Sequence, residues 1–269
     1  MKIAVATIFY NSKAELERLI NSIPDKAIDW FIGIDGIFKY TKEQNPELPE
    51  LSNDGSNEII INDLIGNIGR ITNIASYRFN MPNSTEYEKR NKYLEICKSM
   101  EIDYLIIVDS DEYFIYNEGI TPERSWQIFR RNFEQLAEKN AFRHNVFSIR
   151  SWDVASNSEA VRARCWYNPG DMRYIHNSHY HYYNEKTEQK DLEHCIQNRL
   201  TYCQSTRGVI KGLTLAHDHS LRTKEQLRLR EQYQRYLITY ESLVQNGYKP
   251  DEAHRLAKLN PSKDFNPTV

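Results

Sequence analysis

The stretch YLIIVDSDEYF, residues 104–114, sets the expectations for the rest of the chain. It begins with five apolar residues, Tyr104 to Val108, whose β-branched and aromatic types are typical of a strand buried on both faces. Three carboxylates follow within four residues, at Asp109, Asp111 and Glu112. Like charges this close raise one another's pKa unless a cation lies among them. The alternative interpretation is a strand followed by a solvated polar turn.

The position of these acids favours a ligand site over a simple turn. In open α/β sheets, ligands bind just beyond the carboxyl ends of the strands. Carboxylate oxygens there suit Mg²⁺ or Mn²⁺, and such an ion in turn binds phosphate oxygens. The motif therefore predicts a divalent cation and a phosphate-bearing ligand.

Composition places the chain among ordinary globular proteins. Of its 269 residues, 40% are hydrophobic and 27% charged, and the net charge of -2 does not support a broad nucleic-acid surface. No apolar run approaches the roughly 20 residues that a membrane helix needs, so we expect no integral membrane segment. The four cysteines lack CxxC spacing, which favours reduced thiols, no zinc site and a cytoplasmic location.

The order of the elements predicts a parallel sheet. A strand over residues 2–9 is followed by a helix that Pro24 ends, and then by a second strand, Trp30 to Ile34, which together make a β-α-β unit. The polar stretch 39–57 predicts a surface loop, and residues 58–62 a third strand. Further strands are expected at 143–154 and 207–216, and an irregular stretch at 162–184. Helices are expected at 86–100, 122–140, 223–240 and 251–259.

Three predicted strand ends carry acids or histidines. Asp35 follows the second strand, Asp109 and Asp111 follow the central one, and His217 and His219 follow the strand at 207–216. Because parallel strands end at one edge of a sheet, these side chains can converge. Carboxylates with an imidazole form a reasonable set for a divalent ion that keeps open positions for phosphate and water.

Several segments of the sequence resemble the GT-A-fold glycosyltransferases, in particular the large nucleotide-sugar transferase family that includes spore-coat and cellulose synthases. FYNSKAELERLINSI (9–23) resembles that family's first strand, Tyr-Asn turn and helix. Asp35 takes the place of its carboxylate after the second strand, and KRNKYLEICKSMEIDYLIIVDSDEYF (89–114) resembles its Arg-Asn helix, strand and DxD motif. Beyond residue 115 the resemblance is loose, in RARCWYN, RYIHNSH and AHDHSLRTKEQL.

The resemblance implies a GT-A (Rossmann-like), mixed and mainly parallel sheet flanked by helices, with a helical C-terminal segment. We expect one domain over residues 1–269, in which 1–115 bind the nucleotide sugar, 116–222 face the acceptor and 223–269 form C-terminal helices.

The resemblance also implies roles for individual residues. Phe9 and Tyr10 would line the nucleobase pocket, and Asp35 would accept a hydrogen bond from the uracil N–H. Arg90 would approach the phosphates of the donor, and Asp109 would reach the ribose or the metal shell. The residues implied for Mn²⁺ or Mg²⁺ are Asp109, Asp111, His217 and His219.

The family's acidic base motif is not evident in this sequence. Asp153, after the strand at 143–154, is a candidate base for deprotonating an acceptor hydroxyl. A turn residue is the plainer interpretation of this aspartate. His176 is a second candidate, either as base or as acceptor-binding residue, and a packing or surface role is the alternative for it.

The expected activity is transfer of a sugar from a nucleotide-diphosphate sugar, by the resemblance a UDP-sugar, to an acceptor hydroxyl. A glycan, a protein side chain and a modified nucleic-acid base are all open as acceptors. Three alternatives remain: a haloacid-type phosphatase, a nucleotidyltransferase and a catalytically inactive sugar-nucleotide-binding module. The phosphatase fits poorly, because in that class the DxD motif follows the first strand, whereas here it lies past residue 100. The nucleotidyltransferase fits poorly because this sequence lacks the Gly-rich loop that follows the first strand in that class.

Overall fold

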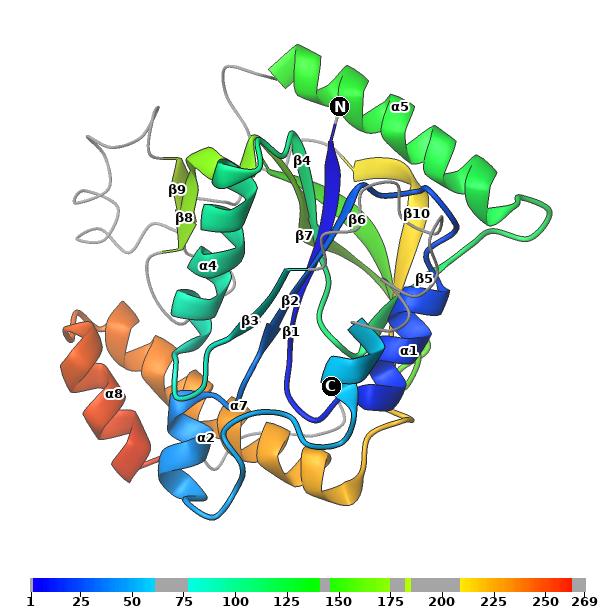
Figure 1. Cartoon of the computed structure of the whole chain (residues 1–269). Coiled ribbons are helices and arrows are strands. Elements are labelled where there is room, and N and C mark those ends of the chain that lie inside the picture. Colours follow the sequence, from blue (N-terminus) through cyan, green and yellow to red (C-terminus); the bar gives the residue numbers. More distant parts are fainter. Residues whose placement is uncertain (1, 61–76, 141–145, 175–181, 185–208, 263–269) are drawn as a thin grey trace.

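The computed structural model describes residues 2–60, 77–140, 146–174, 182–184 and 209–262. Most of its strands form one sheet in the order β3-β2-β1-β4-β7-β6-β10-β5 (Figure 1). A separate pair joins β8 (Met172–Tyr174) to β9 (Tyr182–Asn184). The strands of the main sheet are β1 (Ile3–Phe9), β2 (Trp30–Asp35), β3 (Tyr77–Asn80), β4 (Tyr104–Ile107), β5 (Glu112–Ile115), β6 (Val146–Asp153), β7 (Ser158–Tyr167) and β10 (Val209–His217).

The sheet is mixed, with parallel pairing on both sides of one antiparallel strand. β3, β2, β1 and β4 run parallel to one another, and β6 runs parallel to β10. β7 is antiparallel to both β4 and β6, so β6 and β10 point the same way as β4. At the edge, β5 pairs antiparallel with β10. The predicted α/β class with a mixed, mainly parallel sheet is therefore confirmed.

Helices cover both faces of this sheet and one of its ends. In Figure 1, α4 lies on one side, α1 and α5 on the other, and α7 crosses the end of the sheet beside α2 and α8. Capping boxes at Thr85 and Thr223 fix where α4 and α7 begin. The helices are α1 (Lys13–Asn21), α2 (Lys39–Gln44), α4 (Glu86–Ser99), α5 (Pro122–Asn140), α7 (Lys224–Gln245) and α8 (Pro250–Leu259), with a short 3₁₀ turn at Pro169–Asp171.

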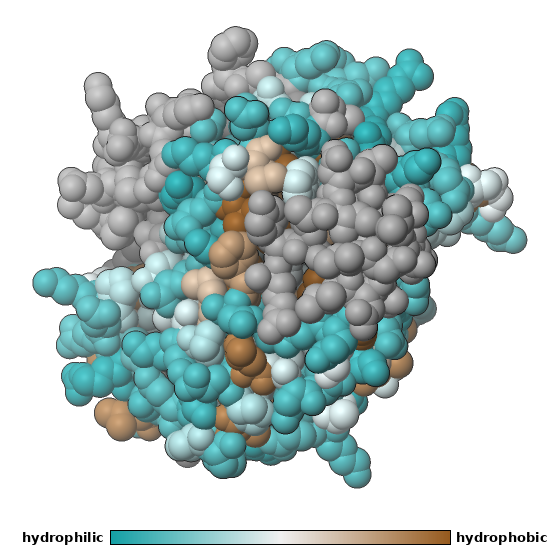
Figure 2. Space-filling view, in the orientation of Figure 1, coloured by the Kyte–Doolittle hydropathy of each residue, from teal (hydrophilic) through white to brown (hydrophobic). Residues whose placement is uncertain are grey.

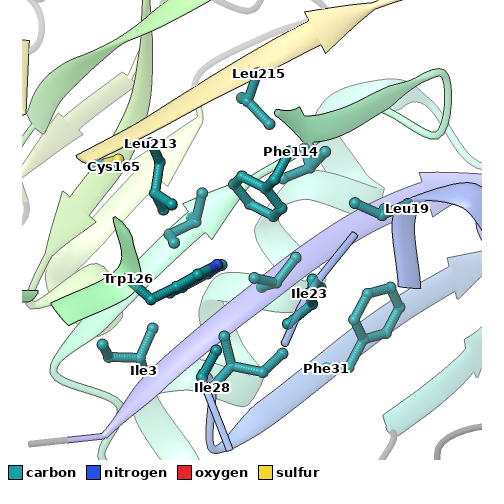
Figure 3. Packing of buried hydrophobic residues seen from close by; sticks show 14 of the residues in the cluster. Ile3, Leu19, Ile23, Ile28, Phe31, Phe114, Trp126, Cys165, Leu213 and Leu215 are labelled. Carbon is teal, nitrogen blue, oxygen red and sulfur yellow. The ribbon is translucent and has the colours of Figure 1, made fainter. Parts of the chain in front are cut away.

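Alternation along the strands sends side chains into two separate cores. In β1, Ile3 and Val5 join the core under α1 and α5, whereas Ala4 and Ala6 join the core under α4. Figure 3 shows the first core, where Trp126 of α5 lies among aliphatic side chains from several strands. Fully burying one such large side chain contributes about 1.5–3 kcal/mol. A tyrosine-rich third cluster joins α2, α7 and α8, which confirms the helical C-terminal segment.

Gly212 allows α5 to pack closely on β10. Its φ of +108° lies in a region that side-chain-bearing residues rarely adopt, and a Cβ there would come 2.6 Å from the backbone of Ser125 and Phe129. The pairing of β10 with β6 is also interrupted between Ile210 and Thr214. The irregularity therefore lets the helix approach while β10 resumes its register toward His217.

Three sequence expectations are wrong in detail. Residues 58–60, expected as a strand, continue a helical turn that starts at residue 56, where Asp54 accepts a hydrogen bond from the Ser56 N–H. The expected loop at 39–57 contains helix α2. The stretch at 162–184, expected to be irregular, contributes most of β7, which forms a hairpin with β6 and also pairs with β4, a strand distant in the sequence.

The described surface is mostly polar on the face shown in Figure 2, where apolar residues gather in a narrow strip. Among the described residues, no helix combines the length and the apolar character that crossing a bilayer requires.

Candidate functional site

The carboxyl ends of four strands bring the predicted site residues to one rim of the sheet. Asp35 ends β2, Asp109 and Asp111 follow β4, Asp153 ends β6 and His217 ends β10. The parallel direction of these strands is the reason, since β6 and β10 point the same way as β4.

Asp111, His217 and His219 form a compact cluster at this rim. One ligand atom from each lies within 4.8 Å of the other two. Nε2 of His217 is 3.3 Å and Nδ1 of His219 is 2.8 Å from the same oxygen, Oδ2 of Asp111. The imidazole rings meet edge to face with centroids 4.3 Å apart. Among the described residues this is the one group of at least three such side chains placed to hold a metal ion.

The contact between His219 and Asp111 fits a shared cation. Nδ1 of His219 is buried and makes no hydrogen bond with any residue that the structure describes, although it lies 2.8 Å from Oδ2 of Asp111. Two ligands of one octahedral ion, at metal–ligand distances of about 2.1 Å, lie about 3 Å apart. Burial lowers the pKa of His219, which favours the neutral imidazole that binds metals. The residues present therefore fit a divalent ion.

Asp111 is kept ionised by its cationic neighbours. Burial alone would raise its pKa, but Arg222 and then the two histidines hold that pKa well below its usual value. Nη2 of Arg222 lies 2.9 Å from Oδ2 of Asp111. The backbone is fixed as well, because the carbonyl of Asp111 accepts a hydrogen bond from the Asp218 N–H, and Asp218 pairs with Arg18.

Asp153 orients His217. Its Oδ2 lies 3.1 Å from Nδ1 of His217, which leaves Nε2 directed at Asp111. Burial would raise the pKa of Asp153, but hydrogen bonds from Ser156 and His217 lower this pKa to about 2. A carboxylate partner of this kind fixes the ring orientation and tautomer of a histidine ligand.

Asp109 belongs to a different group of charges. Its Oδ2 lies 2.6 Å from Nη2 of Arg164, and the same nitrogen lies 2.9 Å from Oε1 of the fully buried Glu112. Arg164 is an extra residue in β7, because Cys165 pairs with Phe147 while Ala163 pairs with Ser148. Such a bulge redirects a side chain, here toward two carboxylates.

Arg90 connects Asp109 to the C-terminal helix. Its Nη2 lies 2.8 Å from Glu86 and 3.4 Å from Asp109. The hydroxyl of Tyr233, in α7, donates a 2.9 Å hydrogen bond to Oε2 of Glu86. The network is buried at Arg90, Glu86 and Tyr233 and partly exposed at Asp109, and it joins α7, α4 and the end of β4.

The residues predicted for the nucleobase pocket, Asp35, Tyr10 and Phe9, differ in their burial and in their hydrogen bonds. Asp35 is fully buried and accepts hydrogen bonds from Ser52 Oγ, at 2.6 Å, and Asn57 Nδ2, at 2.8 Å. Tyr10 donates to the carbonyl of Pro49, and burial together with Asp35 and Asp54 raises its pKa to about 12. Phe9 is only 2% exposed and lies in the core under α1.

The sequence prediction at His176 lies outside the described residues. Several charged residues of the site were not predicted, namely Glu15, Arg164 and Arg222. An available signal for Arg164 was RAR within an otherwise apolar stretch, because arginines two apart in a strand share one face. Arg222 follows His217 and His219 closely in the sequence, but this closeness alone does not predict that its side chain contacts Asp111.

Comparisons with known proteins gave matches only among solved structures. No protein-family model and no curated protein matches the sequence. Among solved structures, the chain is similar to S. aureus TarS, with 14% identity and a TM-score of 0.46 over 94% of this chain and 45% of that one. The TarS 1-349 structures in complex with UDP-GlcNAc and with UDP give TM-scores of 0.46 and 0.44, at 14% and 15% identity. The matches cover 69% and 68% of those two chains, and each covers 94% of this chain.

The chain therefore spans less than half the length of the full TarS structure. A likeness of this size carries no functional argument, so the function has to be argued from the site.

Proposed function

We propose that this chain is a metal-dependent glycosyltransferase that moves a sugar from a nucleotide-diphosphate sugar, a UDP-sugar, to an acceptor hydroxyl. The observation that carries the proposal is the cluster of Asp111, His217 and His219 at the carboxyl ends of parallel strands. That rim is where open α/β sheets bind their ligands.

Asp111, His217 and His219 would hold the ion, and Asp109 would lie beside it without contacting it, since arginines occupy its carboxylate. A set of two imidazoles and one carboxylate suits Mn²⁺ better than Mg²⁺, which prefers oxygen ligands. When bound, the ion supplies Lewis-acid neutralisation of the charge that develops on the departing diphosphate. The same donor set holds iron(II) in oxygenases, so Fe²⁺ belongs in any metal titration.

Arginines of this rim would supply the remaining positive charge. Arg222 lies at Asp111 and Arg18 holds Asp218 directly beside it. Cations at this rim would stabilise the negative charge that develops on the departing diphosphate. Arg90, predicted to approach the phosphates, would act by orienting Asp109, because Glu86 and Asp109 occupy its guanidinium.

For the nucleobase, Asp35 remains the proposed acceptor of the uracil N–H. Its hydrogen bonds from Ser52 and Asn57 hold the carboxylate in place, and a base would exchange with the Ser52 hydroxyl. Tyr10 is partly exposed next to this carboxylate and could flank a base, whereas Phe9 would support the pocket from within the core.

Asp153 would serve as a positioning residue for His217 in place of the base expected from the sequence. A carboxylate with a pKa near 2 is a weak proton acceptor at neutral pH. His176 stays a candidate for the base and for contact with the acceptor, which we leave as a glycan, a protein or a modified nucleic-acid base.

The test is release of nucleoside diphosphate from a panel of UDP- and GDP-sugars, with and without Mn²⁺. We expect metal-dependent turnover that falls at least 100-fold in Asp111→Asn, because the substitution removes a ligand charge. Glu225→Gln is the matched control, since Glu225 is an exposed carboxylate paired with Arg228 in α7, and the variant should turn over like the wild type.

Other outcomes would favour the alternatives. Cleavage of simple phosphomonoesters without release of UDP or GDP would indicate a phosphatase, and nucleotide-sugar synthesis from a sugar phosphate a nucleotidyltransferase. Tight UDP-sugar binding with no turnover in the presence of any metal would indicate an inactive binding module.

A further inference from the structure

Three groups crowd one oxygen of Asp111. The histidine nitrogens approach Oδ2 to 3.3 Å and 2.8 Å, and Nη2 of Arg222 approaches the same oxygen to 2.9 Å. Histidines are compatible with a shared cation, but a guanidinium is not, because it brings a positive charge to the atom that an ion would bind. Arg222 and a divalent ion therefore compete for Asp111.

A second carboxylate lies within reach of Arg222. Glu15, in the first turn of α1, is only 2% exposed, and its Oε1 accepts no hydrogen bond from any residue in the described part of the chain. Nε of Arg222 lies 3.8 Å from this oxygen, too far for a hydrogen bond. An unsatisfied buried carboxylate oxygen is costly. A small movement of one guanidinium would satisfy it.

The backbone around Arg222 is fixed, so that movement falls to the side chain. Its N–H donates to the carbonyl of His219 at 3.0 Å, and the next residue, Thr223, forms the capping box that starts α7. Between these anchors, the side chain lies between two carboxylates that come from different parts of the fold.

We propose that Arg222 is a built-in placeholder cation, which pairs with Asp111 in the metal-free protein and transfers to Glu15 when a divalent ion binds. The inference rests on the metal site of the proposed function. In this arrangement Asp111 is never left as a buried, unpaired charge, which would be strongly destabilising. Glu15 provides the second resting position, so it favours metal binding without touching the metal.

The experiment is calorimetric titration of the full chain with Mn²⁺ in the absence of any sugar nucleotide. Arg222→Met removes the competitor, so we expect binding to be about tenfold tighter, as befits the loss of a cation within 3 Å. Arg230→Met is the matched control. Its charge also acts on Asp111, but it leaves the placeholder in position, so a smaller gain is expected.

Glu15→Gln gives a second, opposite readout. It removes the resting position, so Mn²⁺ should bind several-fold more weakly than in the wild type. In the Arg222→Met background the same substitution should have no effect, because no guanidinium remains to be moved. This coupling distinguishes transfer between two carboxylates from a general change in charge.

Two results would overturn the proposal in distinguishable ways. If Arg222→Met binds Mn²⁺ no more tightly than Arg230→Met, or if Glu15→Gln acts equally in both backgrounds, Arg222 is not a placeholder while the metal site stands. If Asp111→Asn binds Mn²⁺ as the wild type does, the metal site itself is wrong, and the proposed function falls with it.

Discussion

Asp109 and Asp111 lie two residues apart after β4, yet their carboxylates meet different partners. Asp109 faces two arginines, Arg164 and Arg90, which come from β7 and α4. Asp111 faces the histidines after β10, together with Arg222. Two guanidinium groups occupy the two oxygens of Asp109, whereas Asp111 has one guanidinium and two imidazoles on a single oxygen. An imidazole that has lost its proton can share a carboxylate with a cation. From this comparison we expect a structural role for the Asp109 side and propose metal binding for the Asp111 side.

Removing Arg164 should destabilise the Asp109 side more than the other substitutions below. Arg164→Met leaves Glu112 fully buried without its closest cation, so we expect the free energy of unfolding to fall by about 3–5 kcal/mol. Urea denaturation measures the change. Arg150→Met is the control on the adjacent strand, where the pair with Glu159 is exposed, and it should stay within about 0.5 kcal/mol of the wild type. Equal losses in the two variants would contradict the account.

Lys89 offers a contrast to both sides, because it is a buried cation that no carboxylate of the described residues contacts directly. Its Nζ donates to the carbonyl of Gly36 and lies 4.7 Å from the centroid of the Phe38 ring. Burial lowers its pKa to about 7, against about 10.5 in the unfolded chain. Between these values the unfolded state binds the extra proton, so stability should rise with pH.

The slope is at most about 1.4 kcal/mol per pH unit, and because the folded lysine is half protonated at pH 7, the expected rise from pH 7 to pH 9 is roughly 2 kcal/mol. Lys89→Met should abolish this rise, and urea denaturation across the range would show it. Lys92→Met, at a partly exposed position on the same helix, should keep the wild-type profile. A wild-type stability that does not change between pH 7 and pH 9 would contradict the assignment.

The substitution with the smallest expected effect tests whether the charge network of Asp109 extends to α7. Tyr233→Phe removes one hydrogen bond to the buried Glu86 and should cost about 1–2 kcal/mol in the free energy of unfolding. Tyr248→Phe, at an exposed tyrosine, should cost nothing measurable in the same denaturation assay. If the two variants are equally stable, α7 is not energetically connected to Arg90.

Most of the framework was predictable because it depends on local patterns. The apolar run before Asp109 and the helical spacing at 122–140 gave correct elements, and the order of strands and helices predicted the parallel rim. Errors occurred where long-range pairing decides. β7 was missed although it forms a hairpin with β6, because its other partner, β4, is distant in the sequence. The segment 58–60 is helical although Ile59 and Ile60 look like part of a strand.

The partition of the acids was not predictable from their spacing. Asp109, Asp111 and Glu112 look equivalent in the sequence, and all three could have joined one metal site. They are separated by a β-bulge that directs Arg164 at two of them and by the return of β10 that brings His217 to the third. Both features depend on tertiary pairing, which a single sequence does not reveal.

The central claim is that Asp111 with His217 and His219, and not Asp109, binds the divalent ion. A crystal of the protein grown with Mn²⁺ and UDP, with the manganese located by its anomalous scattering, tests it most directly. We expect a single strong peak bounded by these three side chains, with Asp109 still paired to Arg164. A peak coordinated by Asp109, or UDP bound at the rim without any manganese peak, would contradict it.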